Sequence, residues 1–117
     1  MEITVMLPCL NESETLSICI KKAKNQIKTL KIKGEILIAD NGSTDGSIKL
    51  AKKLGARVIH VKNKGYGHAL RAGIKNAKGK YILIADSDDS YNLNDLPKFY
   101  KKIKKGYDIV QGCRLPK

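Results

Sequence analysis

Short, largely apolar runs alternate along this chain with longer segments in which apolar residues recur every three or four positions. The runs cover residues 3–7, 35–39, 57–61, 81–85 and 108–111, and Pro8 is expected to end the first. The clearest of the longer segments begins near residue 14 and carries its apolar face at Leu16, Ile20, Ala23, Ile27 and Leu30. The runs have the length of buried strands, and the longer repeat is typical of amphipathic helices. The alternation predicts an α/β fold, with a mostly parallel sheet of about five strands and helices on both faces.

Length and cysteine content limit the organisation of the chain. With 117 residues it is long enough for one hydrophobic core, so we expect a single domain over residues 1–117. Its apolar runs have strand length, so we expect neither a membrane-spanning segment nor a signal sequence. Cys9, Cys19 and Cys113 are odd in number and lack metal-type spacing, which indicates a reducing, cytoplasmic location.

The charge is strongly positive. The chain has 23 Lys and Arg against 11 Asp and Glu, a net charge of +12, and only three of the basic residues are Arg. Nucleic-acid readers place stacking aromatics, or Arg, Asn and Gln, among their basic residues, so we expect no nucleic-acid partner. Two interpretations stay open: a solvated lysine surface, or attraction to an anionic partner such as a membrane face or a phosphate-bearing substrate. Peripheral membrane contact would use the basic outer face of the last helical segment, formed by Lys98, Lys101, Lys102, Lys104 and Lys105.

Acidic residues gather where the predicted strands end. In parallel sheets covered by helices, ligands bind beyond the carboxyl ends of the strands, where strand order reverses. Six of the 11 acidic residues fall at this edge, namely Glu12, Asp40, Asp45, Asp86, Asp88 and Asp89. We therefore expect the binding site there.

The most informative of these positions are Asp86, Asp88 and Asp89, three carboxylates within four residues directly after an apolar strand. Like charges this close repel each other unless a cation or a hydrogen-bond network compensates them. An Asp-x-Asp pair at a strand end suits a hard divalent ion that also binds phosphate oxygens. We predict a metal site at Asp86 and Asp88; the alternative is an Asp-rich turn that caps the next helix.

Two further strand-end segments admit a structural and a functional interpretation. Residues 40–47 contain Gly, Ser, Thr and Asp before a helix, so they either cap this helix or hold a sugar hydroxyl or a base edge. Residues 64–67 (KGYG) form either a plain loop or a flexible backbone beside a ligand, with Lys64 near phosphate. His60 lies on a predicted strand and is expected to be packed. The EF-hand calcium loop and the Walker phosphate loop do not fit this sequence.

Taken together and in this order, the strand-end segments resemble those of family 2 glycosyltransferases. The segments are residues 7–12 (LPCLNE), 39–46 (ADNGSTDG), 64–67 (KGYG) and 85–91 (ADSDDSY). The likeness is closest to the branch that transfers sugars to dolichol or polyprenyl phosphate, where a Gly-Ser-Arg after the fifth strand is similar to residues 112–114 (GCR). The resemblance covers nearly the whole chain, and the combination is far more specific than any one segment.

The resemblance implies a Rossmann-like GT-A fold, with this chain as its nucleotide-sugar-binding half, and transfer of the sugar with inversion. It implies that the donor is bound by Pro8, Asn11, Glu12, Asp40, Asp45, Lys64, Gly65, Asp86 and Arg114. It also implies that Asp86 and Asp88 hold a Mg or Mn ion that bridges the diphosphate and neutralises charge on the leaving group. Cys9 and Cys113 depart from the residues expected at their positions.

Fewer residues of this chain indicate how the sugar acceptor is bound. The chain ends at residue 117, where the family continues into its acceptor-binding half and general base, so we expect a truncated domain without an assignable base. The branch implies a lipid phosphate as acceptor. The alternative function is a non-catalytic nucleotide-sugar-binding or regulatory module that another chain completes. We also expect apolar surface near the fifth strand to be covered by self-association or by a partner chain.

Overall fold

The computed structural model describes residues 1–11, 13–62, 65–84, 96–104 and 109–111. These residues form strands and helices in alternation, as predicted. The strands are β1 (Ile3–Cys9), β2 (Gly34–Asp40), β3 (Arg57–His60), β4 (Tyr81–Ile84) and β5 (Ile109–Gln111). The helices are α1 (Ser13–Leu30), α2 (Ser47–Lys53), α3 (Tyr66–Asn76) and α4 (Leu96–Lys104).

The strands form one five-stranded sheet in the order β3-β2-β1-β4-β5. Every pairing between neighbours in this order is parallel. The chain moves outward from β1 through β2 to β3 and then returns to the other side of β1 with β4. Strand order therefore reverses between β1 and β4, which is where such sheets bind ligands. The predicted α/β class and parallel sheet are confirmed.

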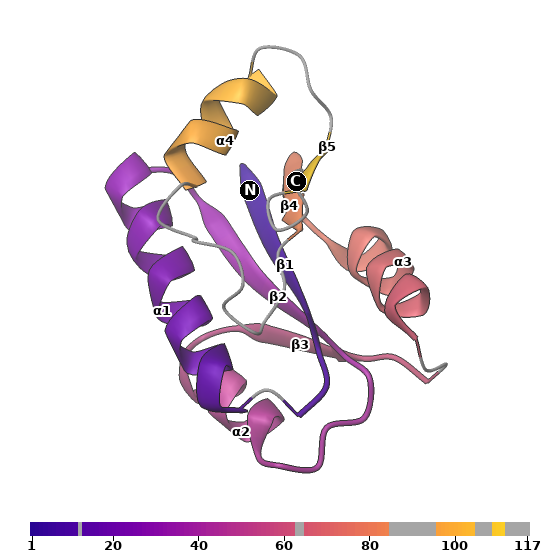
Figure 1. The fold of residues 1–117 in the computed structure, drawn as a ribbon. Helices are drawn as coiled ribbons and strands as arrows, with labels where there is room; N and C mark the ends of the chain where they lie inside the picture. Colours follow the sequence, from indigo (N-terminus) through magenta and orange to yellow (C-terminus); the bar gives the residue numbers. More distant parts are fainter. Residues whose placement is uncertain (12, 63–64, 85–95, 105–108, 112–117) are drawn as a thin grey trace.

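Two hydrophobic clusters cover the two faces of the sheet. Successive residues of a strand point to opposite faces, so Ile3, Val5 and Leu7 pack in one cluster with residues of α1, α2 and α4. Met6 packs in the other cluster with residues of α3. Figure 1 shows the same arrangement, with α1, α2 and α4 on one side of the sheet and α3 on the other. Helices on both faces were predicted, and the structure confirms them.

β1 extends beyond the point at which Pro8 was expected to end it. Pro8 lies opposite Ala39 in the ladder with β2, and Cys9 lies opposite Asp40. On the other side of β1, the ladder with β4 ends at Met6. Proline has no N–H group to donate. At the level of Pro8, the described part of β4 has no residue that would accept a hydrogen bond from β1. The extension brings the end of β1 level with the end of β2.

A hydrogen-bonded network closes the amino edge of the sheet. Glu35 of β2 accepts bonds from Thr4 Oγ1 at 2.7 Å, from Arg57 Nε at 2.9 Å and from the Lys78 main-chain N–H at 2.8 Å. Arg57 also donates to the Asn76 carbonyl oxygen at 2.6 Å. Burial by itself would raise the pKa of Glu35, but the bonds from Arg57, Lys78 and Thr4 outweigh it and hold the pKa below its ordinary value of 4.5. The network joins β1, β2 and β3 to the end of α3.

Two glycines let α3 and the turn after it approach β1 closely. A Cβ atom added at Gly73 would lie 2.6 Å from the Met6 side chain. One added at Gly79 would lie 2.4 Å from the Thr4 nitrogen and 2.5 Å from the Ile3 carbonyl carbon. Because the second contact is with backbone, which cannot move aside as a side chain can, Gly79 is required at this point of the amino edge.

Candidate functional site

The carboxyl edge of the sheet brings together the loops that follow β1 and β2. Cys9 and Asp40, the last residues of these strands, face each other in the ladder. The Asn41 main-chain N–H donates to the Cys9 carbonyl oxygen at 2.9 Å. Because β1 also borders β4, this edge lies at the reversal of strand order. The predicted site residues Asn11 and Asp40 therefore lie on neighbouring loops.

Asp40 is buried, with 2% of its surface exposed, and its carboxylate accepts main-chain hydrogen bonds. The Gly42 N–H donates to Oδ2 at 3.0 Å, and the Ser43 nitrogen lies 3.1 Å from Oδ2 and 3.3 Å from Oδ1. No lysine or arginine in the described part of the chain forms an ion pair with this carboxylate. Uncharged N–H groups therefore orient Asp40. Oδ1 takes part only in the longest of these bonds and retains capacity to accept another.

Asn11 and the loop after β2 exchange two hydrogen bonds. The Asn11 main-chain N–H donates to Ser43 Oγ at 2.9 Å, and the Thr44 main-chain N–H donates to Asn11 Oδ1 at 2.8 Å. Asn11 has a φ of +52°, in the left-handed region that asparagine tolerates better than most residues. Sequence analysis predicted Asn11 as a site residue but did not identify Ser43 and Thr44 as its partners. We call these two bonds the clasp.

Asp45 lies two residues before the first residue of α2, and the N-cap position itself is Gly46, which has no side-chain cap bond. Asp45 Oδ1 accepts bonds from the Ser47 main-chain N–H at 3.0 Å and from the Ser47 hydroxyl. Gly46 precedes the helix with a φ of +89°, and in the described part of the chain nothing lies within 4 Å of a Cβ atom added there. The two interpretations of the segment are thus compatible, because its end supports α2 while Asp40 lies at the edge of the sheet.

Of the other residues predicted to bind the nucleotide-sugar, Pro8 and Gly65 lie in the described part of the chain. Pro8 is half-buried near the end of β1. Gly65 is exposed directly before α3, with a φ of +124°. Glu12, Lys64, Asp86, Asp88 and Arg114 lie outside the described residues. Among the described residues, no group of three His, Cys, Asp or Glu side chains could hold a metal ion.

His60 is exposed, and the expectation that it would be packed was wrong. It is the last residue of β3, which is an edge strand of the sheet, and 67% of its side chain is exposed. Its Nδ1 lies 3.9 Å from Asp40 Oδ2. Because periodicity does not reveal which strand is at the edge, sequence analysis could not place His60 beside the candidate site.

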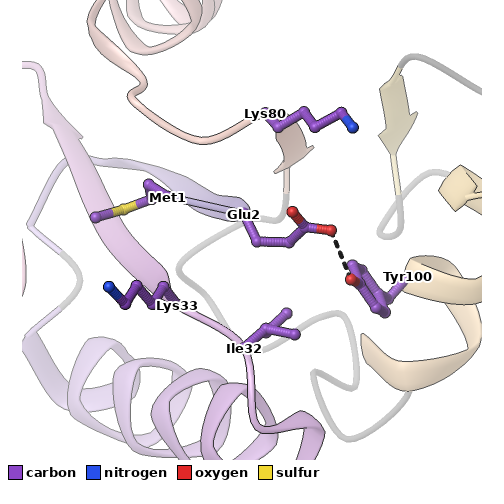
Figure 2. Close-up of a pocket in the computed structure, with 6 residues that line it drawn as sticks. All are labelled: Met1, Glu2, Ile32, Lys33, Lys80 and Tyr100. Carbon is purple, nitrogen blue, oxygen red and sulfur yellow. Dashed lines mark hydrogen bonds between the residues drawn. The ribbon is translucent and has the colours of Figure 1, made fainter.

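A hollow of about 400 Å³ lies at the opposite, amino edge of the sheet (Figure 2). It is lined by Met1, Glu2, Ile32, Lys33, Lys80 and Tyr100. Tyr100 of α4 donates a hydrogen bond to Glu2 Oε2 at 2.6 Å, as Figure 2 shows. This bond is the first cause, and burial the second, of the rise in the pKa of Tyr100 to about 12. The hollow contains none of the predicted site residues, so we place the candidate site at the carboxyl edge.

Membrane-spanning helices were sought over the described ranges, and none of the helices there combines the length and apolarity needed to cross a bilayer.

Comparison with known proteins identifies relatives that match most of the chain. The sequence model of the family described as "Glycosyl transferase family 2" matches residues 4–117. The low-salt glycan biosynthesis hexosyltransferase Agl6 of Haloferax volcanii is 35% identical over 114 residues, which cover 97% of this chain and 27% of that protein. The dolichyl-phosphate hexose transferase of the same organism is 39% identical over 85 residues, covering 73% of this chain and 37% of that protein.

A similar fold occurs in a solved structure of a related enzyme. Glucosyl-3-phosphoglycerate synthase from Mycobacterium tuberculosis, crystallised with Mn²⁺, UDP and glucosyl-3-phosphoglycerate, superimposes with a TM-score of 0.74 and 26% sequence identity. The match covers 87% of this chain and 39% of that one. The present chain thus spans well under half the length of these three proteins.

Proposed function

Because this chain belongs to glycosyl transferase family 2, we propose that the carboxyl edge of its sheet binds a nucleotide-diphosphate sugar, whose sugar is transferred to an acceptor. The observation that carries the proposal is the Asp40 carboxylate, which is buried, oriented by main-chain N–H groups and adjacent to the strand reversal. A carboxylate held in this way can accept hydrogen bonds from a ribose or a base edge. The UDP complex of the mycobacterial synthase supports a nucleotide as the ligand.

The residues that we propose to bind the nucleotide-sugar come from every loop of this edge. Pro8, Asn11, Asp40, Asp45 and Gly65 lie on its described part. Four further donor residues follow the ends of β1, β3, β4 and β5 along the chain, namely Glu12, Lys64, Asp86 and Arg114. A site assembled from several strand ends can contact the base, ribose and diphosphate at once.

We propose Asp86 and Asp88 as the ligands of a Mg or Mn ion. β4 is described up to Ile84, which pairs with Met6 of β1, and the two aspartates follow it in sequence. Mg and Mn ions prefer oxygen ligands, so the carboxylate oxygens of these two aspartates suit either ion. When bound, the ion would neutralise negative charge on the leaving nucleoside diphosphate. The Mn²⁺ of the mycobacterial complex supports this choice of metal.

We propose that the acceptor is a lipid phosphate and that the sugar is transferred to it with inversion of configuration. The similarity to a dolichyl-phosphate hexose transferase supports this acceptor. Exposed lysines of α4, Lys98 and Lys101, provide positive charge for contact with an anionic membrane surface. Asp40 and Asp45 both accept hydrogen bonds within their own loop, so neither is our candidate for the general base. This leaves a second candidate function, a donor-binding module whose base and acceptor surface come from elsewhere.

Calorimetry with nucleoside diphosphates tests the donor site. The chain is titrated with UDP, GDP and dTDP, each with Mn²⁺ and with a chelator. We expect one of them to bind at least about tenfold more tightly with the metal, because the metal bridges carboxylate and diphosphate. Asp88→Ala should abolish this dependence. Glu2→Gln, which changes a carboxylate at the amino edge, is the matched control. Equal affinity with metal and with chelator for all three ligands would contradict the metal assignment.

A further inference from the structure

Ser43 links the two loops of the carboxyl edge through separate parts of the same residue. Its main-chain N–H donates to the Asp40 carboxylate, at 3.1 Å from Oδ2. Its side-chain Oγ accepts the Asn11 main-chain N–H at 2.9 Å and lies 3.8 Å from Cys9 Sγ. One residue therefore orients the carboxylate after β2 and also holds the backbone after β1.

The clasp completes this link from the side of Asn11. Thr44 N–H donates to Asn11 Oδ1, so each loop supplies one side-chain acceptor and one main-chain donor. The left-handed conformation of Asn11 is less favourable than an extended or helical one. The two bonds compensate for this conformation and determine the direction in which the loop leaves β1.

The fold does not depend on the clasp to hold β1 and β2 together. The ladder between these strands runs from Ile3 and Gly34 to Cys9 and Asp40, and Asn41 continues it with a bond to the Cys9 carbonyl. The clasp lies beyond this ladder, with Asn11 exposed and Ser43 half-buried. Water can replace such bonds, so their net contribution to folding is small. Their main effect is to restrict two loops that would otherwise sample several conformations, and such restriction strengthens binding by lowering its entropic cost.

We propose that Ser43 is a positioning residue of the nucleotide site. Through its hydroxyl group it holds Asn11, and through its main chain it holds the Asp40 carboxylate, so that both meet the nucleoside diphosphate in a single arrangement. The inference rests on the proposed function of this edge. It assigns Ser43 and Thr44 a role that is separate from the support of α2 by Asp45 and Ser47.

The test uses whichever of UDP, GDP and dTDP the wild-type chain binds most tightly with Mn²⁺, and measures its binding by calorimetry for the wild-type chain, Ser43→Ala and Ser43→Thr. Ser43→Ala removes the Oγ acceptor and leaves the main-chain bond to Asp40, so we expect the Kd to rise about tenfold, at the upper limit for one hydrogen bond. Ser43→Thr retains a hydroxyl group and should keep the Kd within about twofold. Thr29→Val is the matched control, because it removes a hydroxyl that donates to the Asn25 carbonyl on α1, far along the chain from this edge.

The readouts distinguish positioning from a purely structural role. Positioning predicts a higher Kd at unchanged stoichiometry, together with faster hydrogen exchange of the Asn11 amide in Ser43→Ala. A structural role would lower the melting temperature or the stoichiometry and leave the Kd of the folded molecules unchanged, which would overturn the inference. A Ser43→Thr variant as weak as Ser43→Ala would also overturn it. If the wild-type chain binds none of UDP, GDP and dTDP, the proposed function itself fails, and the role of Ser43 fails with it.

Discussion

Two carboxylates at opposite ends of β2 show how differently this sheet treats its two edges. Glu35, near the amino end, is surrounded by side-chain partners and forms an ion pair with Arg57 at 2.9 Å. Asp40, at the carboxyl end, is the more deeply buried, yet its described bonds come from main-chain N–H groups. The charge of Glu35 is therefore compensated by Arg57 within the fold, whereas main-chain N–H groups orient Asp40, without a lysine or arginine ion pair among the described residues.

The glycines repeat this contrast. At the amino edge, an added Cβ at Gly79 would collide with the backbone of β1. At the carboxyl edge, Gly42 and Gly46 have positive φ angles, and no atom of the described residues lies within 4 Å of an added Cβ at either. The amino edge is thus tightly packed around Gly79, although a hollow lies elsewhere on it, whereas the turns at Gly42 and Gly46 have room for a further side-chain atom among the described residues. A binding site needs such room, and a stable fold needs such packing.

The largest expected effect is that of Gly79→Ala. Because the new methyl group would press on the backbone at Thr4 and Ile3, we expect it to lower the free energy of unfolding by about 3 kcal/mol or more. Gly46→Ala is the matched control at the open edge, where only the positive φ opposes the substitution, and we expect a loss of about 1 kcal/mol. Urea denaturation measures both. Equal losses would contradict the description of one edge as packed and the other as open.

Glu35→Gln tests the charge of the amino edge and should be the next in size. It leaves Arg57 without its ion pair, and because Arg57 is partly exposed we expect a loss of about 2 kcal/mol at neutral pH. Asp40→Asn keeps an oxygen for the main-chain donors, so it should cost less than about 1 kcal/mol while weakening nucleotide binding. A larger stability loss in Asp40→Asn than in Glu35→Gln would reverse the comparison.

Glu35→Gln also has a pH signature. The folded pKa of Glu35 lies below the ordinary value of 4.5, so its contribution to stability is fully present above that pH. It is lost as the pH falls through the folded pKa. The stability difference between wild type and Glu35→Gln should therefore shrink in acid, as measured by urea denaturation across this range. A difference that is independent of pH would show that the carboxylate charge is not the cause.

Tyr100→Phe, which removes the bond to Glu2 at the amino edge, should have a smaller effect than Gly79→Ala and Glu35→Gln. We expect a loss of about 1 kcal/mol. The pKa of Tyr100 is raised to about 12, so this contribution is present below its ordinary value of 10.0 and is lost as the pH rises through 12. Phenolate absorbance during alkaline titration measures the shift. Tyr81→Phe is the comparison, since the Tyr81 hydroxyl makes no hydrogen bond within the described ranges: stability should stay unchanged, and the pKa of Tyr100 should fall only slightly, because the charge of Tyr81 is the last of its causes.

Sequence analysis predicted the elements better than the contacts between them. The five strands and the first helix were placed from their own apolar runs and repeats, and their described boundaries differ from the structure by no more than two residues, as at Pro8. Asn11 and Asp40 were predicted as site residues because both were expected to follow strands, and the structure places them on neighbouring loops at one edge of the sheet. Their bonds to Ser43 and Thr44 were not predicted, since a clasp between residues more than 30 positions apart depends on strand register. For the same reason Glu35 was taken only as a strand residue, although it accepts bonds from β1, β3 and the turn after α3.

The sequence by itself determined the α/β class and the family, and it predicted a binding site at the carboxyl edge of the sheet. These follow from local periodicity and from the order of motifs along the chain, neither of which requires knowledge of long-range contacts. Only the tertiary structure decided that β1 lies between β2 and β4, that His60 is exposed beside Asp40 and that Ser43 joins the two loops. Strands of similar apolar composition do not encode their neighbours individually. Their order is set when helices on both faces bury them together, and that order brings distant polar residues within hydrogen-bonding distance.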